Sequence, residues 1–216
     1  MSCKKTRLVP GSVQNKEVQV AFAELILKTI ETSKNENCQV LFFDPTHQVH
    51  NTVNGYCWQE KGKDNTKIVF SNSGRKRINI IGAINAVTYQ PTTLITEDNC
   101  DKEMIKIFLE EIKKDYPKAD KIYIFLDNAR YSRNYDIYEY AKKLKIELMF
   151  LPPYSPNLNL IERLWKFLKK KIRKNKYYDT FEKFKTAVFD FFKNIEQYKT
   201  ELEKLLVHKF EIINRN

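Results

Sequence analysis

Three carboxylates stand at positions from which they could meet at one site. Asp44 ends the apolar run Gln39-Val-Leu-Phe-Phe-Asp44, and Asp127 ends a second run, Lys121-Ile-Tyr-Ile-Phe-Leu-Asp127. Such runs predict buried strands, and parallel strands place functional groups where their carboxyl ends meet. Glu162 follows Asp127 after 34 intervening residues and stands three residues after Asn159, the capping-box spacing that begins a helix. A helix packed beside the second strand would present Glu162 to both aspartates.

Clustered carboxylates repel one another and stay ionised together only around a cation. Hard divalent cations prefer oxygen ligands, and two of them about 3.5–4 Å apart can drive phosphoryl transfer. The sequence has only 3 histidines and no evident Ser/His pair to supply another nucleophile. Taken singly, each aspartate also fits a turn or cap residue, and Glu162 also fits a capping-box partner. Their joint placement favours metal-assisted attack by water or by a 3′-hydroxyl.

A strongly basic segment follows the third carboxylate directly. Residues 160–174 predict an amphipathic helix, and residues 163–176 hold eight basic residues and no acid. Spacings of four, three and four residues put Glu162 on one face with a row of cations, a track that suits a phosphate backbone. The alternative is an ordinary solvated basic face. Trp165 is expected to lie in the core and not to serve as a base-stacking platform. The residues predicted to contact DNA are Arg75, Arg77, Lys166, Lys169, Lys170 and Arg173.

The composition agrees with a soluble nucleic-acid-binding domain. The 216 residues include 38 Lys and Arg against 27 Asp and Glu, a net charge of +11, and this points to a polyanionic partner. Hydrophobic residues make up 42% of the chain, which is enough for a core and argues against disorder. No apolar run approaches the ~18 residues of a membrane span, so we expect no membrane association. The four scattered cysteines suit a reducing cytosol.

The order of predicted elements indicates an α/β fold. Strands come first and helices then alternate with strands, which predicts a mixed sheet flanked by helices, with extra C-terminal helices. A ribonuclease H-like sheet has this order, and several other α/β folds share it. The predicted strands are 39–44, 79–88, 92–96, 121–127 and 146–151, with strand-like segments at 49–60 and 66–71. The predicted helices are 21–31, 101–116, 134–144, 160–174, 180–195 and 197–210.

Four segments resemble the DDE transposases of prokaryotic insertion sequences, in the branch related to mariner elements. They are LFFDPTHQVHN (41–51), SNSGRKRINIIGAI (71–84), IYIFLDNARYSRN (122–134) and LPPYSPNLNLIERLWKFLKKKI (151–172). The last is the most specific, because its Pro-Pro-Tyr-Ser-Pro-x-Leu-Asn-x-Ile-Glu pattern is similar to the family's third-carboxylate signature. The gap of 34 residues before Glu162 is also similar to this branch. The resemblance covers residues 40–195.

The resemblance implies a ribonuclease H-like fold in which Asp44, Asp127 and Glu162 hold two Mg²⁺ or Mn²⁺ ions. It implies hydrolytic cutting of double-stranded DNA at element ends, then attack of the freed 3′-hydroxyl on target DNA, usually at a TA step. It further implies a homodimer on DNA and a cytoplasmic, nucleoid-associated prokaryotic protein. The expected division is an N-terminal lead-in with one helix (1–36), a ribonuclease H-like DDE catalytic domain (37–195) and a C-terminal helical tail (196–216).

Members of this family normally carry helix-turn-helix domains ahead of the catalytic domain. Only about 40 residues precede Asp44, too few for two such domains. Either a separately encoded or frameshifted helix-turn-helix portion supplies the rest, or the sequence is a fragment, or the element is decayed. Two other functions stay open at this point. One is a non-catalytic basic DNA-binding remnant or accessory factor of a decayed or split transposase, and the other is a different ribonuclease H-like nuclease.

Overall fold

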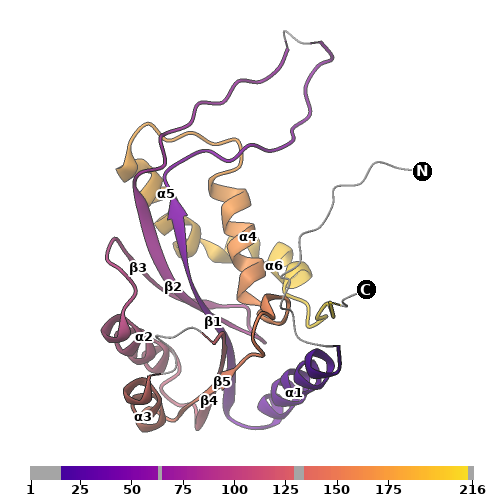
Figure 1. The fold of residues 1–216 in the computed structure, drawn as a ribbon, viewed down its shortest axis with the longest axis vertical. Helices are drawn as coiled ribbons and strands as arrows, with labels where there is room; N and C mark the ends of the chain where they lie inside the picture. The colour runs from indigo at the N-terminus through magenta and orange to yellow at the C-terminus, as the bar shows by residue number, and fades with distance from the viewer. Residues whose placement is uncertain (1–15, 63–64, 129–133, 214–216) are drawn as a thin grey trace, which may run out of the picture.

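The computed structural model describes residues 16–62, 65–128 and 134–213. At its centre lies a five-stranded sheet with the strand order β3-β2-β1-β4-β5. β1 pairs antiparallel with β2, and β2 with β3, whereas β1 pairs parallel with β4, and β4 with β5. The predicted mixed sheet is confirmed (Figure 1). The strands are β1 (Cys38–Val49), β2 (Arg77–Asn85), β3 (Pro91–Thr96), β4 (Lys121–Leu126) and β5 (Ile146–Phe150).

Successive side chains of the strands pack into two separate hydrophobic cores, one on each face of the sheet. In β1, Val40 and Phe42 belong to one hydrophobic cluster, and Leu41 and Phe43 belong to the other. This alternation is the period of two that a strand imposes on its side chains. It explains why β1 reads as an uninterrupted apolar run, since both of its faces are covered. The sheet is therefore buried between two layers of helices.

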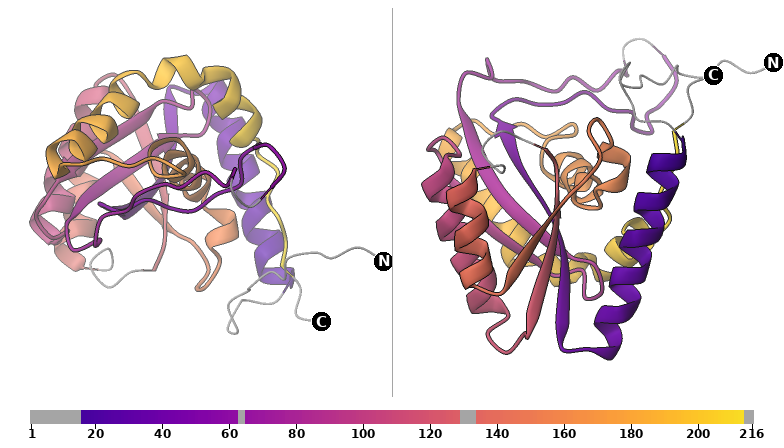
Figure 2. Two further views of the ribbon diagram at one scale, coloured as in Figure 1. Left: turned by 90° about the horizontal axis from the view of Figure 1, so that it is seen from above. Right: turned by 60° about the horizontal axis from the view of Figure 1, so that its bottom comes forward.

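The helices divide between the two faces of the sheet (Figure 2). The first cluster takes residues from α1 (Lys16–Asn35), α4 (Ile161–Ile172), α5 (Phe181–Lys193) and α6 (Lys199–Leu205). The second takes residues from α2 (Lys102–Asp115) and α3 (Tyr135–Lys143). Two short 3₁₀ turns, η1 (Pro156–Leu158) and η2 (Ile195–Tyr198), flank α4 and α6. In the described part of the chain, no helix has the length and apolarity to cross a membrane.

The first cluster bears on the expected domain boundaries. It contains Ile26 and Ile30 from α1 together with Leu202 and Leu206 from the C-terminal end. The lead-in helix and the tail therefore pack on the same core as the sheet between them. The predicted boundaries at 36/37 and 195/196 separate segments that share one hydrophobic cluster.

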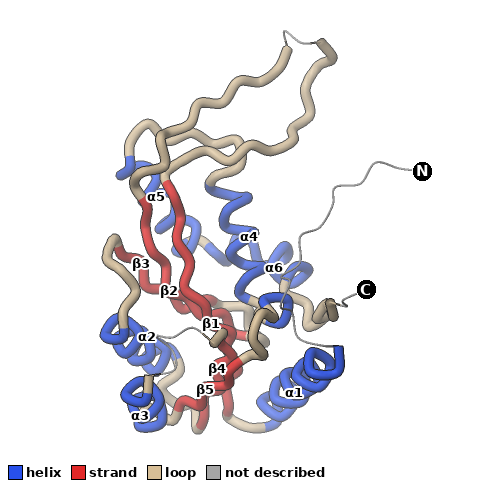
Figure 3. The backbone as a smooth tube through the Cα atoms, viewed as in Figure 1, coloured by secondary structure: helices blue, strands red, loops and turns tan. Residues whose placement is uncertain are grey.

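Two predictions of secondary structure were wrong. The strand-like segments 49–60 and 66–71 contain no strand beyond the end of β1 among their described residues, and they form an extended arm between β1 and β2 (Figure 3). The arm carries few buried side chains, and Trp58 is fully exposed at 103%. Strand pairing in the arm would therefore bury little apolar surface, and the sheet does not extend into it. The last helix was predicted to reach residue 210 but ends at Leu205.

Arg163 makes three of the hydrogen bonds that hold the segment following α6. The Arg163 guanidinium of α4 donates to the main-chain carbonyls of Leu205, Val207 and Lys209 at 3.2, 2.7 and 2.7 Å. These three carbonyls lie at and beyond the end of the helix, where no further helical turn can satisfy them. Arg163 therefore replaces the missing helical hydrogen bonds and fixes the path of the tail.

Replacing Arg163 by Met is expected to lower the free energy of unfolding by about 2 kcal/mol, because hydrogen bonds to charged groups contribute about 1.5–3 kcal/mol. Urea denaturation measures the loss, and amide hydrogen exchange at residues 205–209 locates it. Lys170→Met on the same helix is the control, since Lys170 is exposed. Equal losses in the two variants would contradict the anchoring role.

Candidate active site

Two of the three carboxylates emerge side by side from parallel strands. Asp127 follows the last residue of β4 directly, as predicted. Asp44 was predicted to end its strand, but β1 continues to Val49. The reason is that β1 has two different neighbours: its pairing with β4 stops at Phe43–Leu126, while its pairing with β2 runs on to Val49–Arg77. Both aspartates thus stand one residue past the end of the parallel ladder.

The third carboxylate arrives on α4, but not through the predicted capping box. Glu162 is the second residue of the helix, and the N-cap position is Leu160, which makes no side-chain capping bond. The Asn159 side chain instead donates from Nδ2 to the main-chain carbonyl of Phe43 at 3.1 Å. The amide therefore ties the start of α4 to β1 beside Asp44. The spacing identified the helix start correctly, and the role assigned to Asn159 was wrong.

The three carboxylates share one hollow of about 480 Å³. Asp127 is exposed, whereas Asp44 and Glu162 are partly buried. The remaining lining comes from Asn128, Asn159 and the Leu151–Pro156 loop that connects β5 to η1. This Pro-rich loop forms one side of the hollow. The structure therefore brings the predicted acidic trio to one cavity.

The electrostatics of the hollow are those of crowded acids. The pKa of Asp44 is raised to about 8, chiefly by burial and then by the charges of Glu162 and Asp127, while the hydrogen bond from Trp165 acts in the opposite direction. Burial also raises the pKa of Glu162, with Asp127 adding to the shift and Lys166 opposing it. Near neutral pH these groups ionise together only when a cation offsets their repulsion. The donor set consists of oxygens alone, which suits a hard divalent cation.

The acids do not form a preformed cage around one ion. In the ranges that the structure describes, no three side chains of His, Cys, Asp or Glu lie close enough to hold a metal together. Mg²⁺ rarely needs such a cage, because it usually takes one or two carboxylates and completes its shell with water and substrate phosphate. The arrangement therefore fits ions that are each held by one or two of the carboxylates.

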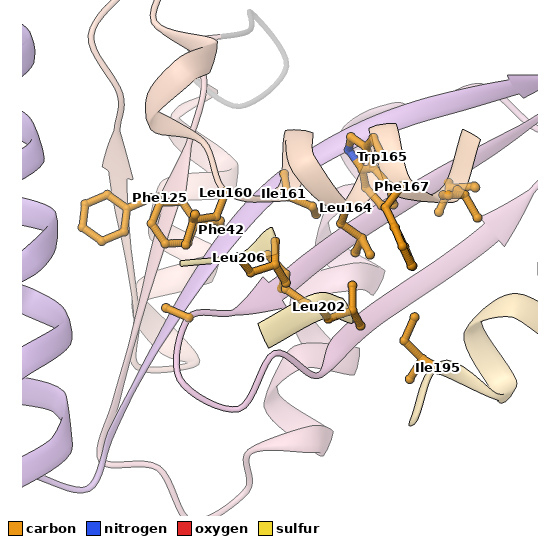
Figure 4. Packing of buried hydrophobic residues seen from close by; sticks show 14 of the residues in the cluster. Phe42, Phe125, Leu160, Ile161, Leu164, Trp165, Phe167, Ile195, Leu202 and Leu206 are labelled. Carbon is orange, nitrogen blue, oxygen red and sulfur yellow. The ribbon is translucent and has the colours of Figure 1, made fainter. Parts of the chain in front are cut away.

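Two residues that contact the site were not predicted from the sequence as functional. Trp165 lies in the core at 5% exposure, as expected, but its Nε1–H also donates to Asp44 Oδ2 at 3.2 Å. Gly82 of β2 pairs with Asp44 across the ladder, and a Cβ on it would lie 2.5 Å from the indole. The three-residue spacing of Glu162 and Trp165 places both on one side of α4, which is the signal that could have found the contact. Figure 4 shows Trp165 over the strands with its neighbours from α4.

The predicted DNA contacts fall into three groups. Lys166, Lys169 and Lys170 are exposed along α4, and Lys166 lies close enough to Glu162 to affect its pKa. Arg75 and Arg77 are exposed near the start of β2. Since Arg77 pairs with Val49, it lies five residues, or about 17 Å, from the level of Asp44. They are therefore remote from the acids, unlike Lys166.

Arg173 does not belong to this exposed set. It is only 8% exposed, and its guanidinium donates to the main-chain carbonyl of Asn51 at 3.3 Å and to the Asn51 side chain. Its assignment as a DNA contact was wrong, because the row of cations turns inward where α4 meets the arm. Arg173 instead fastens the base of the arm to the end of α4.

A sequence profile of the family described as "DDE superfamily endonuclease" matches residues 39–185, which contain all three carboxylates. The chain belongs to this DDE endonuclease family. A curated relative from Sinorhizobium fredii, named "Uncharacterized protein y4pE/y4sA", is 31% identical over 87 residues, covering 38% of this chain. The match spans 59% of that relative's own length.

Solved structures of a mariner transposase share the fold of this DDE endonuclease. The structure titled "Crystal structure of the mariner Mos1 paired end complex with Mg" superimposes with a TM-score of 0.68 at 15% identity, covering 96% of this chain and 64% of that one. The isolated "catalytic domain of Mos1 mariner transposase" gives a TM-score of 0.59 at 12% identity, covering 93% and 94%. The predicted ribonuclease H-like fold is confirmed.

Proposed function

We propose that this chain is the catalytic domain of a DNA transposase. It cuts DNA strands at the ends of a mobile element and joins the freed 3′-hydroxyl to target DNA. The observation that carries the proposal is the meeting of Asp44, Asp127 and Glu162 around one hollow. These residues come from two parallel strands and a helix, and they lie within the DDE endonuclease match. Three acids lining one hollow repel one another, and a divalent cation would offset that repulsion.

Asp44, Asp127 and Glu162 are the proposed ligands of two Mg²⁺ or Mn²⁺ ions. Structures of Mos1 paired-end complexes are titled with Mg and with Mn. When bound, such ions polarise the scissile phosphate and offset its developing charge. The protein's own contribution is to hold the carboxylates in place. The Trp165 N–H fixes Asp44, the Asn159 amide ties α4 to β1, and Lys166 lies beside Glu162.

Supercoiled plasmid DNA provides the test of the proposed activity. The chain is expected to convert it to nicked circles in Mg²⁺ or Mn²⁺, leaving 3′-hydroxyl ends that a DNA polymerase extends. EDTA is expected to stop the reaction. Nicking that persists in EDTA would contradict the metal-dependent mechanism. DNA binding without nicking in either metal would instead favour the non-catalytic DNA-binding remnant.

Double-stranded DNA is the proposed partner, lying along Lys166, Lys169 and Lys170 of α4 beside the acids. Replacing Lys166 and Lys169 by Ala is expected to weaken binding to all DNA sequences alike. Each lost phosphate contact flattens the dependence of log K on log salt by about 0.9. Fluorescence anisotropy at several salt concentrations measures the two slopes.

The matched control removes the same charge from the other face of the sheet. Lys142 and Lys143 on α3 are both exposed, and α3 packs on the second cluster. Their double replacement by Ala is expected to leave the slope nearly unchanged. If both double variants lowered the slope equally, the proposed DNA track on α4 would be contradicted, and net charge alone would account for binding.

The proposal extends to the assembly on DNA. Two copies act together at paired ends, with a separately encoded or frameshifted helix-turn-helix portion for end recognition, in the nucleoid of a prokaryotic cytoplasm. The arm supports self-assembly, because four large apolar side chains stand exposed on it. They are Tyr56, Trp58, Ile68 and Phe70, at 97, 103, 83 and 71% exposure. Exposed apolar groups that gather on one segment mark interaction surfaces.

A further inference from the structure

The indole of Trp165, in the core of α4, makes a hydrogen bond to an acid of the site. Its Nε1–H donates to Asp44 Oδ2 at 3.2 Å. The indole N–H is a donor only, so its partner must be an acceptor, and an ionised carboxylate is the strongest one available. The contact thus selects one orientation of the Asp44 carboxyl group.

The sheet makes room for this contact at one position. Val40 and Phe42 of β1 face the cluster that contains α4, so the alternation of side chains turns Asp44 to the same face. Its partner on β2 is Gly82, which is buried. A Cβ at Gly82 would stand 2.5 and 2.9 Å from two atoms of the indole six-membered ring. Any side chain there displaces the indole from Asp44.

Gly82 is not explained by backbone conformation. The described glycines with positive φ are Gly62 and Gly74, whereas Gly82 lies in regular strand. The absence of a side chain therefore serves the close approach of Trp165, not a turn. A buried indole N–H needs an acceptor, and here that acceptor is an acid of the site.

We propose that Trp165 is a positioning residue of the site, holding Asp44 in the orientation that binds the divalent cation, and that Gly82 provides the space for it. The inference rests on the proposed function, because it takes Asp44 as a metal ligand. Removing a residue that hydrogen-bonds to a metal ligand and orients it typically lowers the metal affinity by about 10–100-fold. Trp165 acts through Asp44 and contacts neither metal nor DNA itself.

Isothermal titration calorimetry of the metal-free protein with Mg²⁺ provides the first test. Trp165→Phe keeps an aromatic ring and removes the N–H, and Gly82→Ala keeps the N–H and displaces it. Each is expected to weaken Mg²⁺ binding by about 10–100-fold. In the Trp165→Phe background, Gly82→Ala is expected to add little, because phenylalanine lacks the two ring atoms that the new methyl group meets.

Phe167→Leu is the control for core packing. Phe167 lies on the same helix at 7% exposure and has no described contact with Asp44. It is expected to lower thermal stability and leave the Mg²⁺ affinity unchanged. If Phe167→Leu weakened Mg²⁺ binding as much as Trp165→Phe, a general loosening of α4 would account for the effect and the proposal would be overturned.

Fluorescence provides a readout that needs no change at the site. The chain has 2 tryptophans, and Trp58 is fully exposed on the arm, so Trp58→Phe leaves Trp165 as the only indole. Mg²⁺ is expected to shift the emission of Trp165 with the same midpoint as the calorimetric titration. Asp44→Asn is expected to remove the shift.

The outcomes separate the two proposals. If wild-type protein bound no Mg²⁺ or Mn²⁺, the proposed function would fail first. If it bound Mg²⁺ while Trp165→Phe and Gly82→Ala bound it equally well and the emission of Trp165 did not move, the positioning role would be overturned and the proposed function would stand.

Discussion

Replacing Asp127 by Asn is expected to abolish Mg²⁺-dependent nicking while DNA binding persists. Asp127 stands directly after β4, beside Asp44 and on the hollow that all three acids share. An amide is a weaker ligand for a hard cation than a carboxylate and carries no charge. If the variant loses roughly 4 kcal/mol of transition-state stabilisation, its nicking rate falls by about 10³-fold. Plasmid nicking and fluorescence anisotropy measure the two properties on one sample.

The matched control lies at the other end of the same strand. Asp120 is exposed and immediately precedes β4. Asp120→Asn therefore removes the same charge from the same element without touching the hollow, and it is expected to nick at the wild-type rate. An Asp127→Asn variant that nicks as fast as wild type would remove Asp127 from the catalytic set. Loss of DNA binding in that variant would show that Asp127 serves the interface.

The metal-free protein is expected to lose stability as pH rises from about 4 to about 8. The pKa of Asp44 in the folded state is raised from 3.8 to about 8, chiefly by burial and then by Glu162 and Asp127. Over that window the folded state binds more protons than the unfolded state, so the free energy of unfolding falls with pH. Each pKa unit corresponds to about 1.4 kcal/mol, which makes the total loss several kcal/mol. Burial raises the pKa of Glu162 as well, which adds to the loss with the same sign.

Urea denaturation in EDTA across this window measures the loss, and Asp44→Asn is expected to flatten it, because an amide does not titrate. Saturating Mg²⁺ is expected to restore stability most at the upper end of this window, where the Asp44 proton competes least with metal binding. A stability that rises between pH 4 and pH 8 without metal would contradict the electrostatic account of the site.

Much of the fold was predictable because its signals are local. Apolar runs and helical stripes identified the strands and helices of the sheet region, and the placement of Asp127 after its strand followed from the same pattern. The position of Asp44 within β1 was not predictable, because it depends on where the pairing with β4 stops and the pairing with β2 continues. Strand ends are set by neighbours that are remote in sequence, and these were unknown.

The misjudged side chains share a physical cause. Asn159 and Arg173 both occur at positions where helix rules assign them a local role, as a cap and as an exposed cation. Each instead donates to a main-chain carbonyl of the β1 region, at Phe43 and at Asn51. Gly82 and Trp165 form a third such case, since their closeness arises only when β2 and α4 pack together. Contacts between distant segments override local preference at this site.

The hydrogen bonds at the base of the arm connect it to the helix α4. The Arg173 guanidinium donates to Asn51, and the Val53 N–H donates to the Arg173 carbonyl at 3.0 Å. The arm is therefore hydrogen-bonded to the C-terminal end of α4. Glu162 lies near the other end of α4, which is a helix of 12 residues and about 18 Å. A macromolecule that docks on the arm therefore contacts a segment that is hydrogen-bonded to the same helix that carries the third acid.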